Sequence, residues 1–170
     1  MSETRARIER HVRDHPGVHF NELVRSLDLA PGQVQYHVRR LLDREDVARE
    51  RLYGRTHYYP PAFDAWERGT LALVRRETAR DVLGYLLERG DAPPGEVADA
   101  LGVARSTLEW HLDHLVERDV VEKERDADGR VTLTLVRPEA TRDLLGAVSP
   151  SLPDQFVDRF TRLVDDLLDS

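Results

Sequence analysis

The sequence predicts a mainly α-helical fold with small β-hairpins, an α+β class, in which one domain plan occurs twice. Two observations predict this. Residues 8–51 align with residues 82–125 without a gap, at a constant offset of 74 positions, and apolar and polar positions both match. Each copy also shows three helical periodicities followed by two β-prone stretches. Two copies are too few for a solenoid, so we expect two similar domains in tandem.

Two helices open the first copy. The first is expected over about residues 3–14 and ends before Pro16 and Gly17, because neither residue favours continuation of a helix. After a short β-prone stretch, Asn21 is expected to cap a second helix over 22–27, since its side chain can accept a hydrogen bond from the first turn.

The third helix is expected to begin at Pro31, a residue that suits a first helical turn. Val34, Val38 and Leu41 follow at i, i+4 and i+7 and form one buried stripe. The corresponding residues of the second copy are Leu108, Leu112 and Leu115. The third helix of each copy therefore has one face that packs in the core and an outer face that is available for binding.

A hairpin follows each third helix. In the first copy, residues 47–52 and 56–59 favour strands around a turn at 53–55. In the second copy we expect helices over 80–88, 95–101 and 105–117, and strands over 121–125 and 131–136 around Asp128-Gly129.

These elements predict a first domain over residues 1–60, a largely helical linker over 61–77, a second domain over 78–137 and a C-terminal helical extension over 138–170. After a proline-containing break, the last helix carries an apolar stripe that either covers the domain cores or pairs two subunits. We assign the stripe to dimerisation as a hypothesis. Its residues are Phe156, Phe160, Leu163, Val164 and Leu167.

Three helices followed by a hairpin make the winged helix-turn-helix plan. Val34-Gln-Tyr-His-Val-Arg-Arg-Leu41 and Leu108-Glu-Trp-His-Leu-Asp-His-Leu115 resemble the recognition helix of archaeal and bacterial winged-helix regulators of the broad ArsR- and MarR-like group. Tyr53-Gly-Arg-Thr-His-Tyr-Tyr-Pro60 is similar to the wing of haloarchaeal regulators. This resemblance implies sequence-directed binding of double-stranded DNA, commonly by a homodimer, with the third helix in the major groove and the wing at the backbone.

The charge of the chain is unevenly distributed. Its formal net charge of -7 would count against nucleic-acid binding. However, only Lys123 is a lysine, and this acidic, arginine-for-lysine composition resembles that of proteins from salt-loving archaea. Residues 1–60 hold eleven arginines against nine carboxylates, a net charge of +2, whereas residues 78–137 hold eight basic and thirteen acidic residues, a net charge of -5. The first copy is therefore the basic part.

The outer face of the first copy's third helix carries side chains that suit a DNA groove. Arginine can pair with guanine O6 and N7, and glutamine with adenine N6 and N7. The candidate DNA-binding residues are Gly32, Gln33, Gln35, Tyr36, Arg39 and Arg40 on the helix, with Arg51, Arg55 and His57 on the wing. The alternative for these residues is an ordinary solvated surface.

The second copy differs at these positions. Glu109, Asp113 and His114 replace Gln35, Arg39 and Arg40, respectively, and carboxylates repel phosphate. We therefore expect the first copy to read DNA and the second to support it. A rival hypothesis is a protein-interaction module, in which the acidic second domain binds a protein of transcription or chromosome-organising machinery.

Other functions have little support in the sequence. There is no cysteine, and the usual motifs of hydrolases, nucleotide-binding enzymes and zinc proteases are missing, so neither an enzyme nor a cofactor is expected. His11, His15 and His19 are spaced by four, which could suggest a metal site. Pro16 and Gly17 interrupt their helix, however, so no metal site is expected. His37 and His111 are expected to hydrogen-bond within their own domains. Without a long apolar run, we expect a soluble, cytoplasmic protein.

Overall fold

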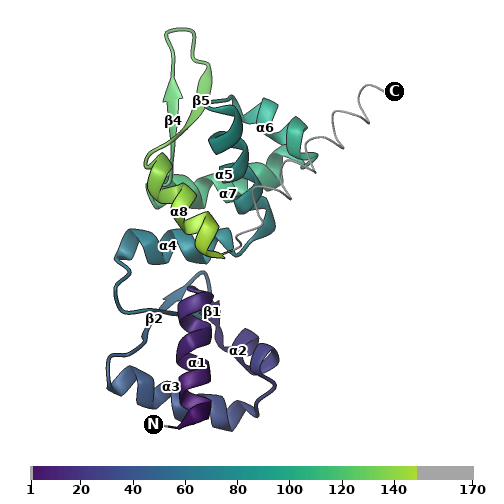
Figure 1. Ribbon diagram of the computed structural model, residues 1–170. Helices are drawn as coiled ribbons and strands as arrows, with labels where there is room; N and C mark the ends of the chain where they lie inside the picture. Colours follow the sequence, from purple (N-terminus) through teal and green to yellow (C-terminus); the bar gives the residue numbers. More distant parts are fainter. Residues whose placement is uncertain (1, 149–170) are drawn as a thin grey trace. The chain divides into compact units, whose positions relative to one another are not determined.

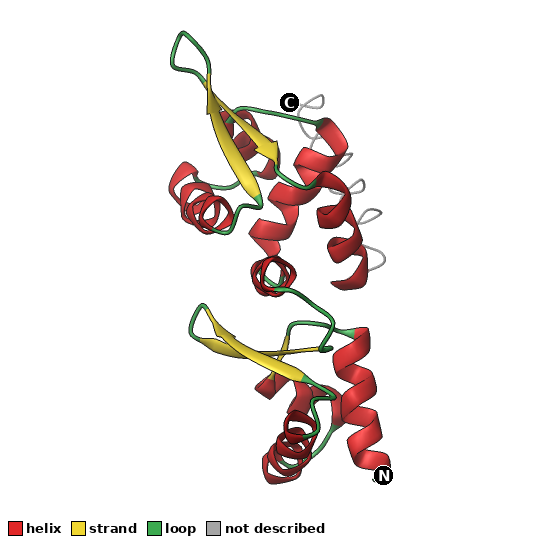
Figure 2. Cartoon of the chain, turned by 90° about the vertical axis from the view of Figure 1, so that its left-hand side faces the viewer, coloured by secondary structure: helices red, strands yellow, loops and turns green. Residues whose placement is uncertain are grey.

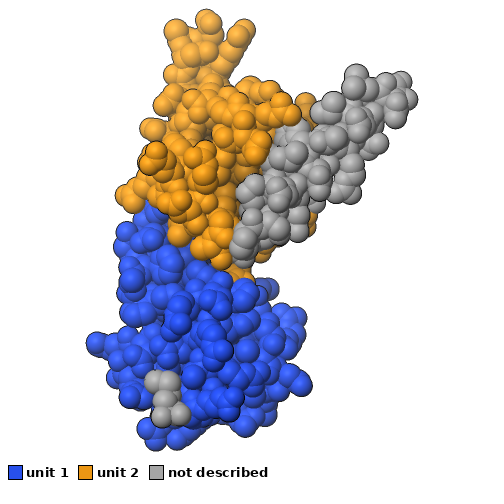
Figure 3. Space-filling view, viewed as in Figure 1, with its two compact units in different colours: residues 1–72 blue, residues 73–170 orange. Residues whose placement is uncertain are grey.

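The computed structural model describes residues 2–148, which form helices and short antiparallel strands (Figure 1). Two compact units divide the chain, residues 1–72 and 73–170, coloured separately in Figure 3. The expected class is confirmed, and Figure 2 shows red helices together with yellow antiparallel strands in each unit. No helix of the described residues is long and apolar enough to cross a membrane.

The first unit contains the expected elements in the expected order. Their bounds are α1 Glu3–Asp14, β1 Val18–His19, α2 Phe20–Leu27, α3 Pro31–Asp43, β2 Ala48–Leu52 and β3 Arg55–Tyr59. Strand β3 lies between β1 and β2 and is antiparallel to both. Three helices thus precede a hairpin whose second strand also pairs with the short strand between α1 and α2.

One buried cluster joins the helices of the first unit to its sheet. Val34, Val38 and Leu41 of α3 are at most 4% exposed and belong to the same cluster as Ile8 and Val12 of α1. Burying one such side chain stabilises a fold by about 1.5–3 kcal/mol. The predicted stripe of α3 is therefore the face that fixes this helix in the unit, and its opposite face is left to solvent.

Helix α2 begins earlier than expected. It starts at Phe20, and its N-cap is His19, whose Nδ1 accepts a hydrogen bond from the Glu22 backbone N–H at 3.4 Å. The prediction of Asn21 as the cap is therefore wrong. Because His19 is extended as the last residue of β1, the chain changes direction there, and the imidazole supplies the acceptor that a first turn needs.

A two-residue turn joins β2 to β3. Tyr53 and Gly54 have φ angles of 53° and 79°, the left-handed pair that suits a tight hairpin. Leu52 is paired with Arg55, so Arg55 is the first residue of β3 rather than part of the turn. Burial then increases along β3, and its last three residues, His57, Tyr58 and Tyr59, are all buried.

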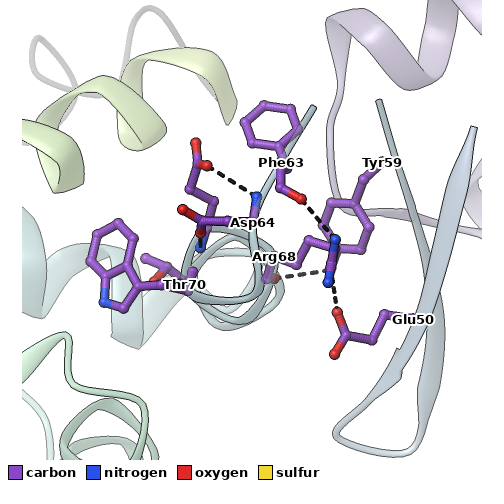
Figure 4. Close-up of polar contacts among 8 residues, drawn as sticks. Glu50, Tyr59, Phe63, Asp64, Arg68 and Thr70 are labelled. Carbon is purple, nitrogen blue, oxygen red and sulfur yellow. Dashed lines mark hydrogen bonds and ion pairs between the residues drawn. The ribbon is translucent and has the colours of Figure 1, made fainter. Parts of the chain in front are cut away.

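Helix α4 (Ala65–Val74) is the helical part of the expected linker. Arg68 on this helix donates to the Glu50 carboxylate of β2 at 2.6 Å and to the Phe63 carbonyl at 2.7 Å (Figure 4). The Tyr59 hydroxyl donates to the Arg68 carbonyl at 2.9 Å. These contacts attach the start of α4 to the hairpin of the first unit, although nothing in the sequence marks Glu50 and Arg68 as partners.

The second unit repeats the plan. Its elements are α5 Glu77–Arg89, α6 Pro94–Leu101, α7 Arg105–Glu117, β4 Val121–Arg125, β5 Val131–Leu135 and α8 Pro138–Val148. An isolated antiparallel bridge links Ala92 to Leu133, and Ala92 lies 74 positions after Val18 of β1. Leu108, Leu112 and Leu115 of α7 are fully buried, which confirms the second predicted stripe.

The backbone repeats as closely as the sequence does. Asp28 and Gly102, which follow α2 and α6, have φ angles of 52° and 65°. Glu45 and Asp119, which follow α3 and α7, have φ angles of 61° and 58°. Both pairs are 74 positions apart, so the two copies use the same left-handed positions to leave their helices.

Helix α8 completes the second unit. Leu144 and Leu145 are at most 5% exposed, and α8 lies against α5. The apolar stripe assigned to dimerisation lies outside the described residues. That stripe comprises Phe156, Phe160, Leu163, Val164 and Leu167.

Candidate nucleic-acid interface

The outer face of α3 is exposed along its whole length. Ala30 precedes the helix, and its backbone N–H donates to Gln33 Oε1 at 3.4 Å. Gln33 therefore helps to start α3. Because its amide oxygen already accepts this hydrogen bond, the side chain is less available for an external partner. The exposed residues of the face are Gly32, Gln33, Gln35, Tyr36, Arg39 and Arg40, as the helical periodicity predicts.

Tyr36 and Arg40 are coupled on this face. Arg40 Nε donates to the Tyr36 hydroxyl at 3.0 Å, and the guanidinium carbon lies 5.4 Å from the centre of the tyrosine ring. The Tyr36 side chain is 53% exposed. The pair therefore presents an oriented guanidinium with donors left for a second acceptor, since arginine has five N–H groups.

Arg39 is the arginine of α3 whose side chain makes no polar contact with the described residues. It is exposed, and within residues 2–148 it makes no ion pair and no hydrogen bond through its side chain. Gln35 lies one turn before it on the same side and is also exposed. Both side chains can therefore reach an external partner without first breaking an internal contact.

The hairpin adds exposed arginines. Along β2, exposure alternates so that Arg49 and Arg51 lie on one exposed side, with Glu50 and Leu52 on the other. Arg55 at the start of β3 is exposed as well. Arg49 was not among the predicted residues, although the period-2 alternation of a strand identifies it.

His57 does not belong to this exposed surface. It is only 4% exposed, and its Nδ1 lies 2.7 Å from the Gly17 carbonyl oxygen, which can only accept, so Nδ1 carries the proton. Among the candidate DNA-binding residues, His57 is therefore the one whose side chain is buried rather than exposed on the hairpin. His57 is the β3 partner of His19 on β1, in the part of β3 whose consecutive residues 57–59 are all buried.

His37 and His111 occupy equivalent positions on α3 and α7. In both rings Nδ1 is buried and has no hydrogen-bond partner among the described residues, contrary to the expected bond within each domain. Burial lowers the pKa of each imidazole below its ordinary 6.5, and nearby positive charge acts in the same direction, from Arg5 and Arg40 for His37 and from Arg76 and His114 for His111. Both rings are therefore neutral at pH 7.

The corresponding face of α7 has different chemistry. Glu109, in the place of Gln35, accepts from Lys123 at 2.9 Å and from Arg105 at 3.2 Å. The hydrogen bond from Lys123 is the main reason that the pKa of Glu109 is lowered, so this carboxylate is charged at neutral pH. Asp113, in the place of Arg39, is exposed. This arrangement disfavours approach of phosphate.

Trp110 takes the place of Tyr36 on α7. It is 44% exposed, and the Arg76 guanidinium carbon lies 4.6 Å from its ring centre, within the range of a cation–π contact. His114 lies against the same ring, at 4.4 Å between centres. The second unit thus presents an exposed aromatic ring on the same helix as two carboxylates, the ion-paired Glu109 and the exposed Asp113.

Histidine and carboxylate side chains are the groups of this chain that could ligate a metal ion. Among residues 2–148, no group of three or more His, Cys, Asp or Glu side chains could hold a metal ion. His11 and His15 stack instead, with ring centres 4.2 Å apart. The candidate interface therefore consists of hydrogen-bonding and cationic side chains on α3 and the hairpin.

Comparison with known proteins agrees with this architecture. Residues 2–71 match a family described as an N-terminal HTH domain, and residues 76–124 match a family described as a helix-turn-helix domain. The chain is also similar to a Methanocaldococcus jannaschii protein described as an uncharacterized HTH-type transcriptional regulator, with 26% identity over 129 residues. That match covers 75% of this chain but 32% of the relative. Each half of the chain is therefore similar to a helix-turn-helix family, in agreement with the three helices and the hairpin of each unit.

Proposed function

We propose that this protein is a transcription regulator that binds double-stranded DNA through its first unit. In this proposal, α3 enters the major groove and the β2–β3 hairpin contacts the backbone. The observation that carries it is the contrast between equivalent helices. Arg39 and Gln35 on α3 are exposed and uncommitted, whereas α7 carries Asp113 and the ion-paired Glu109 in their places.

Each side chain has a defined part in this proposal. Gln35, Arg39 and the Tyr36–Arg40 pair face base edges, where one good bidentate contact is worth about 1–3 kcal/mol of discrimination. Arg49 and Arg51 on one side of the hairpin, and Arg55 at its turn end, contact phosphates and contribute affinity rather than sequence preference. Gln33 has a smaller part, because its amide oxygen already caps α3.

A homodimer completes the proposal. Two copies of α3 placed about 34 Å apart would read half-sites one helical turn apart. The apolar stripe that begins at Phe156 is our candidate for the pairing helix. If the chain works in the concentrated salt that its acidic composition suggests, counterion release contributes less and base contacts contribute more of the affinity.

The test is a fluorescence-anisotropy titration of the full chain against random and genomic duplex pools, at low and molar potassium chloride. Arg39→Ala/Arg40→Ala should abolish selective binding, while the matched pair Arg105→Ala/Arg118→Ala in the second unit should leave it nearly unchanged. Equal losses in the two pairs would contradict the division of labour. Absence of binding at both salt concentrations would contradict the proposal.

A second candidate function rests on Trp110. An exposed tryptophan surrounded by Arg76 and His114, beside the carboxylate of Asp113, is typical of a protein-binding surface more than of a DNA-binding one. Under this alternative, the second unit binds a protein of the transcription or chromosome-organising machinery. A Trp110→Ala variant that retains DNA affinity but loses a partner recovered with the native chain would favour it.

A further inference from the structure

The first unit contains an open cavity of about 680 Å³ between the start of α2 and the turn end of its hairpin. Its volume falls within the range of small-molecule sites, about 300–1,000 Å³. The residues lining it are His19, Phe20, Asn21, Val24, Arg25, Gly54, Arg55 and Thr56. They come from two segments about thirty positions apart in the sequence, so the cavity exists only in the folded unit.

Two guanidinium groups line this cavity. Arg25 on α2 and Arg55 on β3 are both exposed, and within the described residues neither forms an ion pair with a carboxylate. No aspartate or glutamate is among the residues that line the cavity, and the Glu22 carboxylate lies 3.8 Å from Nε2 of the lining residue His19. Arg25 and Arg55 carry two positive charges and Glu22 carries one negative charge, so the cavity has a net positive charge that an anion can neutralise.

His19 lies beside one of these cations without accepting a hydrogen bond from it. Its Nε2 lies 3.5 Å from Arg55 Nη1, and its Nδ1 is the acceptor that caps α2. A neutral imidazole has one acceptor nitrogen, so a ring that caps α2 cannot also accept from Arg55. Arg55 therefore keeps its donors for an anion.

The wall of the cavity includes apolar groups. Phe20 and Val24 are partly buried, and each packs against the hydrophobic core on one side while lining the cavity on the other. Asn21 and Thr56 add neutral hydrogen-bonding groups. An inorganic ion would leave the apolar wall wet, whereas an organic anion could cover it.

We propose that this cavity binds a small organic anion whose phosphate or carboxylate is held by Arg25 and Arg55 and whose apolar body lies against Phe20 and Val24. Because Arg55 also belongs to the proposed DNA-binding surface, the ligand competes with DNA for one guanidinium. The competition with DNA rests on the proposed function. The binding of the organic anion to the cavity does not rest on it.

Phenyl phosphate is a suitable probe, with inorganic phosphate for comparison, because the two share the anion and differ in the apolar body. Calorimetric titration of the full chain should give saturable binding of phenyl phosphate and weaker binding of inorganic phosphate. Arg25→Gln should weaken phenyl phosphate binding about tenfold, the loss expected for one charge-assisted hydrogen bond. Arg13→Gln is the matched control, since Arg13 is exposed and lies on α1 away from the cavity.

Circular dichroism would show that each variant is folded, and Arg55→Gln would provide a second variant. Equal binding to the native chain, Arg25→Gln and Arg55→Gln would overturn the site. No saturable binding of phenyl phosphate, together with weaker DNA binding by Arg25→Gln, would overturn it and assign the cavity to a DNA phosphodiester.

A DNA titration then tests the coupling. Phenyl phosphate near its dissociation constant for the native chain should raise the half-saturation concentration of the native chain for DNA more than that of Arg25→Gln, because the variant binds the ligand more weakly. If phenyl phosphate binds but DNA affinity stays constant, the competition is wrong and the site stands. If phenyl phosphate binds and DNA does not bind at all, the proposed function fails and the site stands.

Discussion

Tyr36 and Arg40 show how one hydroxyl can orient a cation at the surface. The hydroxyl accepts from Arg40 Nε, so the guanidinium lies over the ring rather than sampling other rotamers. An arginine that is already oriented loses less conformational entropy when it binds. At the equivalent position Trp110 has no hydroxyl, and its cation comes from Arg76, outside the repeated helix.

Tyr36→Phe tests this orientation. We expect the affinity for DNA to fall by about 0.5–1.5 kcal/mol, the net contribution of one hydrogen bond, because Arg40 loses its acceptor. The free energy of unfolding should stay the same, since the side chain is exposed. Anisotropy titration and urea unfolding measure the two quantities. An unchanged affinity would show that the hydroxyl does not prepare Arg40 for DNA.

His57 has a structural role, and His57→Ala should reveal it. Removing the ring leaves the Gly17 carbonyl without its 2.7 Å donor and opens space beside the core, so the free energy of unfolding should fall by about 1–3 kcal/mol. Urea unfolding followed by circular dichroism measures this loss. Arg51→Ala, at an exposed position on the neighbouring strand, is the control and should unfold like the native chain.

At the scale of elements, each copy leaves its second helix through a left-handed residue. The first copy uses Asp28 and the second uses Gly102. Glycine adopts this conformation without steric cost, whereas an aspartate does so at a penalty. The two copies therefore make the same turn with residues that differ in their preference for the left-handed conformation.

Reciprocal substitutions test this difference. Asp28→Gly should stabilise the chain by about 0.5–1 kcal/mol, and Gly102→Asp should destabilise it by a similar amount. A Cβ at Gly102 would meet no atom within 4 Å, so only backbone strain is at issue. Thermal unfolding of both variants measures the effect. Shifts of the same sign would contradict the backbone explanation.

The contact between α7 and β4 depends on pH. Hydrogen bonding from Lys123 lowers the pKa of Glu109 below its ordinary 4.5, so the folded unit favours the charged carboxylate. The resulting stability is present above pH 4.5 and is lost as the pH falls through the folded-state pKa. Lys123→Met should flatten this part of the stability profile, measured by urea unfolding at a series of pH values. A profile identical to the native one would exclude the contact as its source.

At the scale of the whole molecule, net charge conceals a difference between the copies. The chain carries -7 overall, while residues 1–60 carry +2 and residues 78–137 carry -5. The attraction of phosphate acts over about 10 Å in ordinary salt, so the charge near the bound backbone matters more than the total. A chain of this composition can be acidic overall and still have a basic first unit, as the proposed DNA binding requires.

The salt dependence of DNA binding distinguishes the two hairpins. Arg51→Gln/Arg55→Gln should reduce the slope of log affinity against log salt by about 2, because each lost phosphate contact removes about one released counterion. Arg125→Gln/Arg130→Gln is the matched pair on the hairpin of the second unit and should leave the slope unchanged. Equal slopes in both double variants would contradict DNA binding by the first hairpin.

The sequence by itself determined the repeat, the order of the elements and the buried stripes of the third helices. Val34, Val38 and Leu41 could be assigned to the core because helical periodicity and burial are encoded within a few turns of chain. The exposed face of α3 followed from the same periodicity. The hairpins followed from β-prone residues that flank a glycine turn.

Only the tertiary structure decided which polar groups meet. His57 is buried where β3 pairs with β1, and His19 at the end of β1 is the cap of α2. The same pairing brings Arg55 beside a cavity that Arg25 also lines. Side-chain partners depend on strand register and on rotamers chosen by distant residues. No local pattern encodes these, so the periodic features were predictable and the contacts between segments were not.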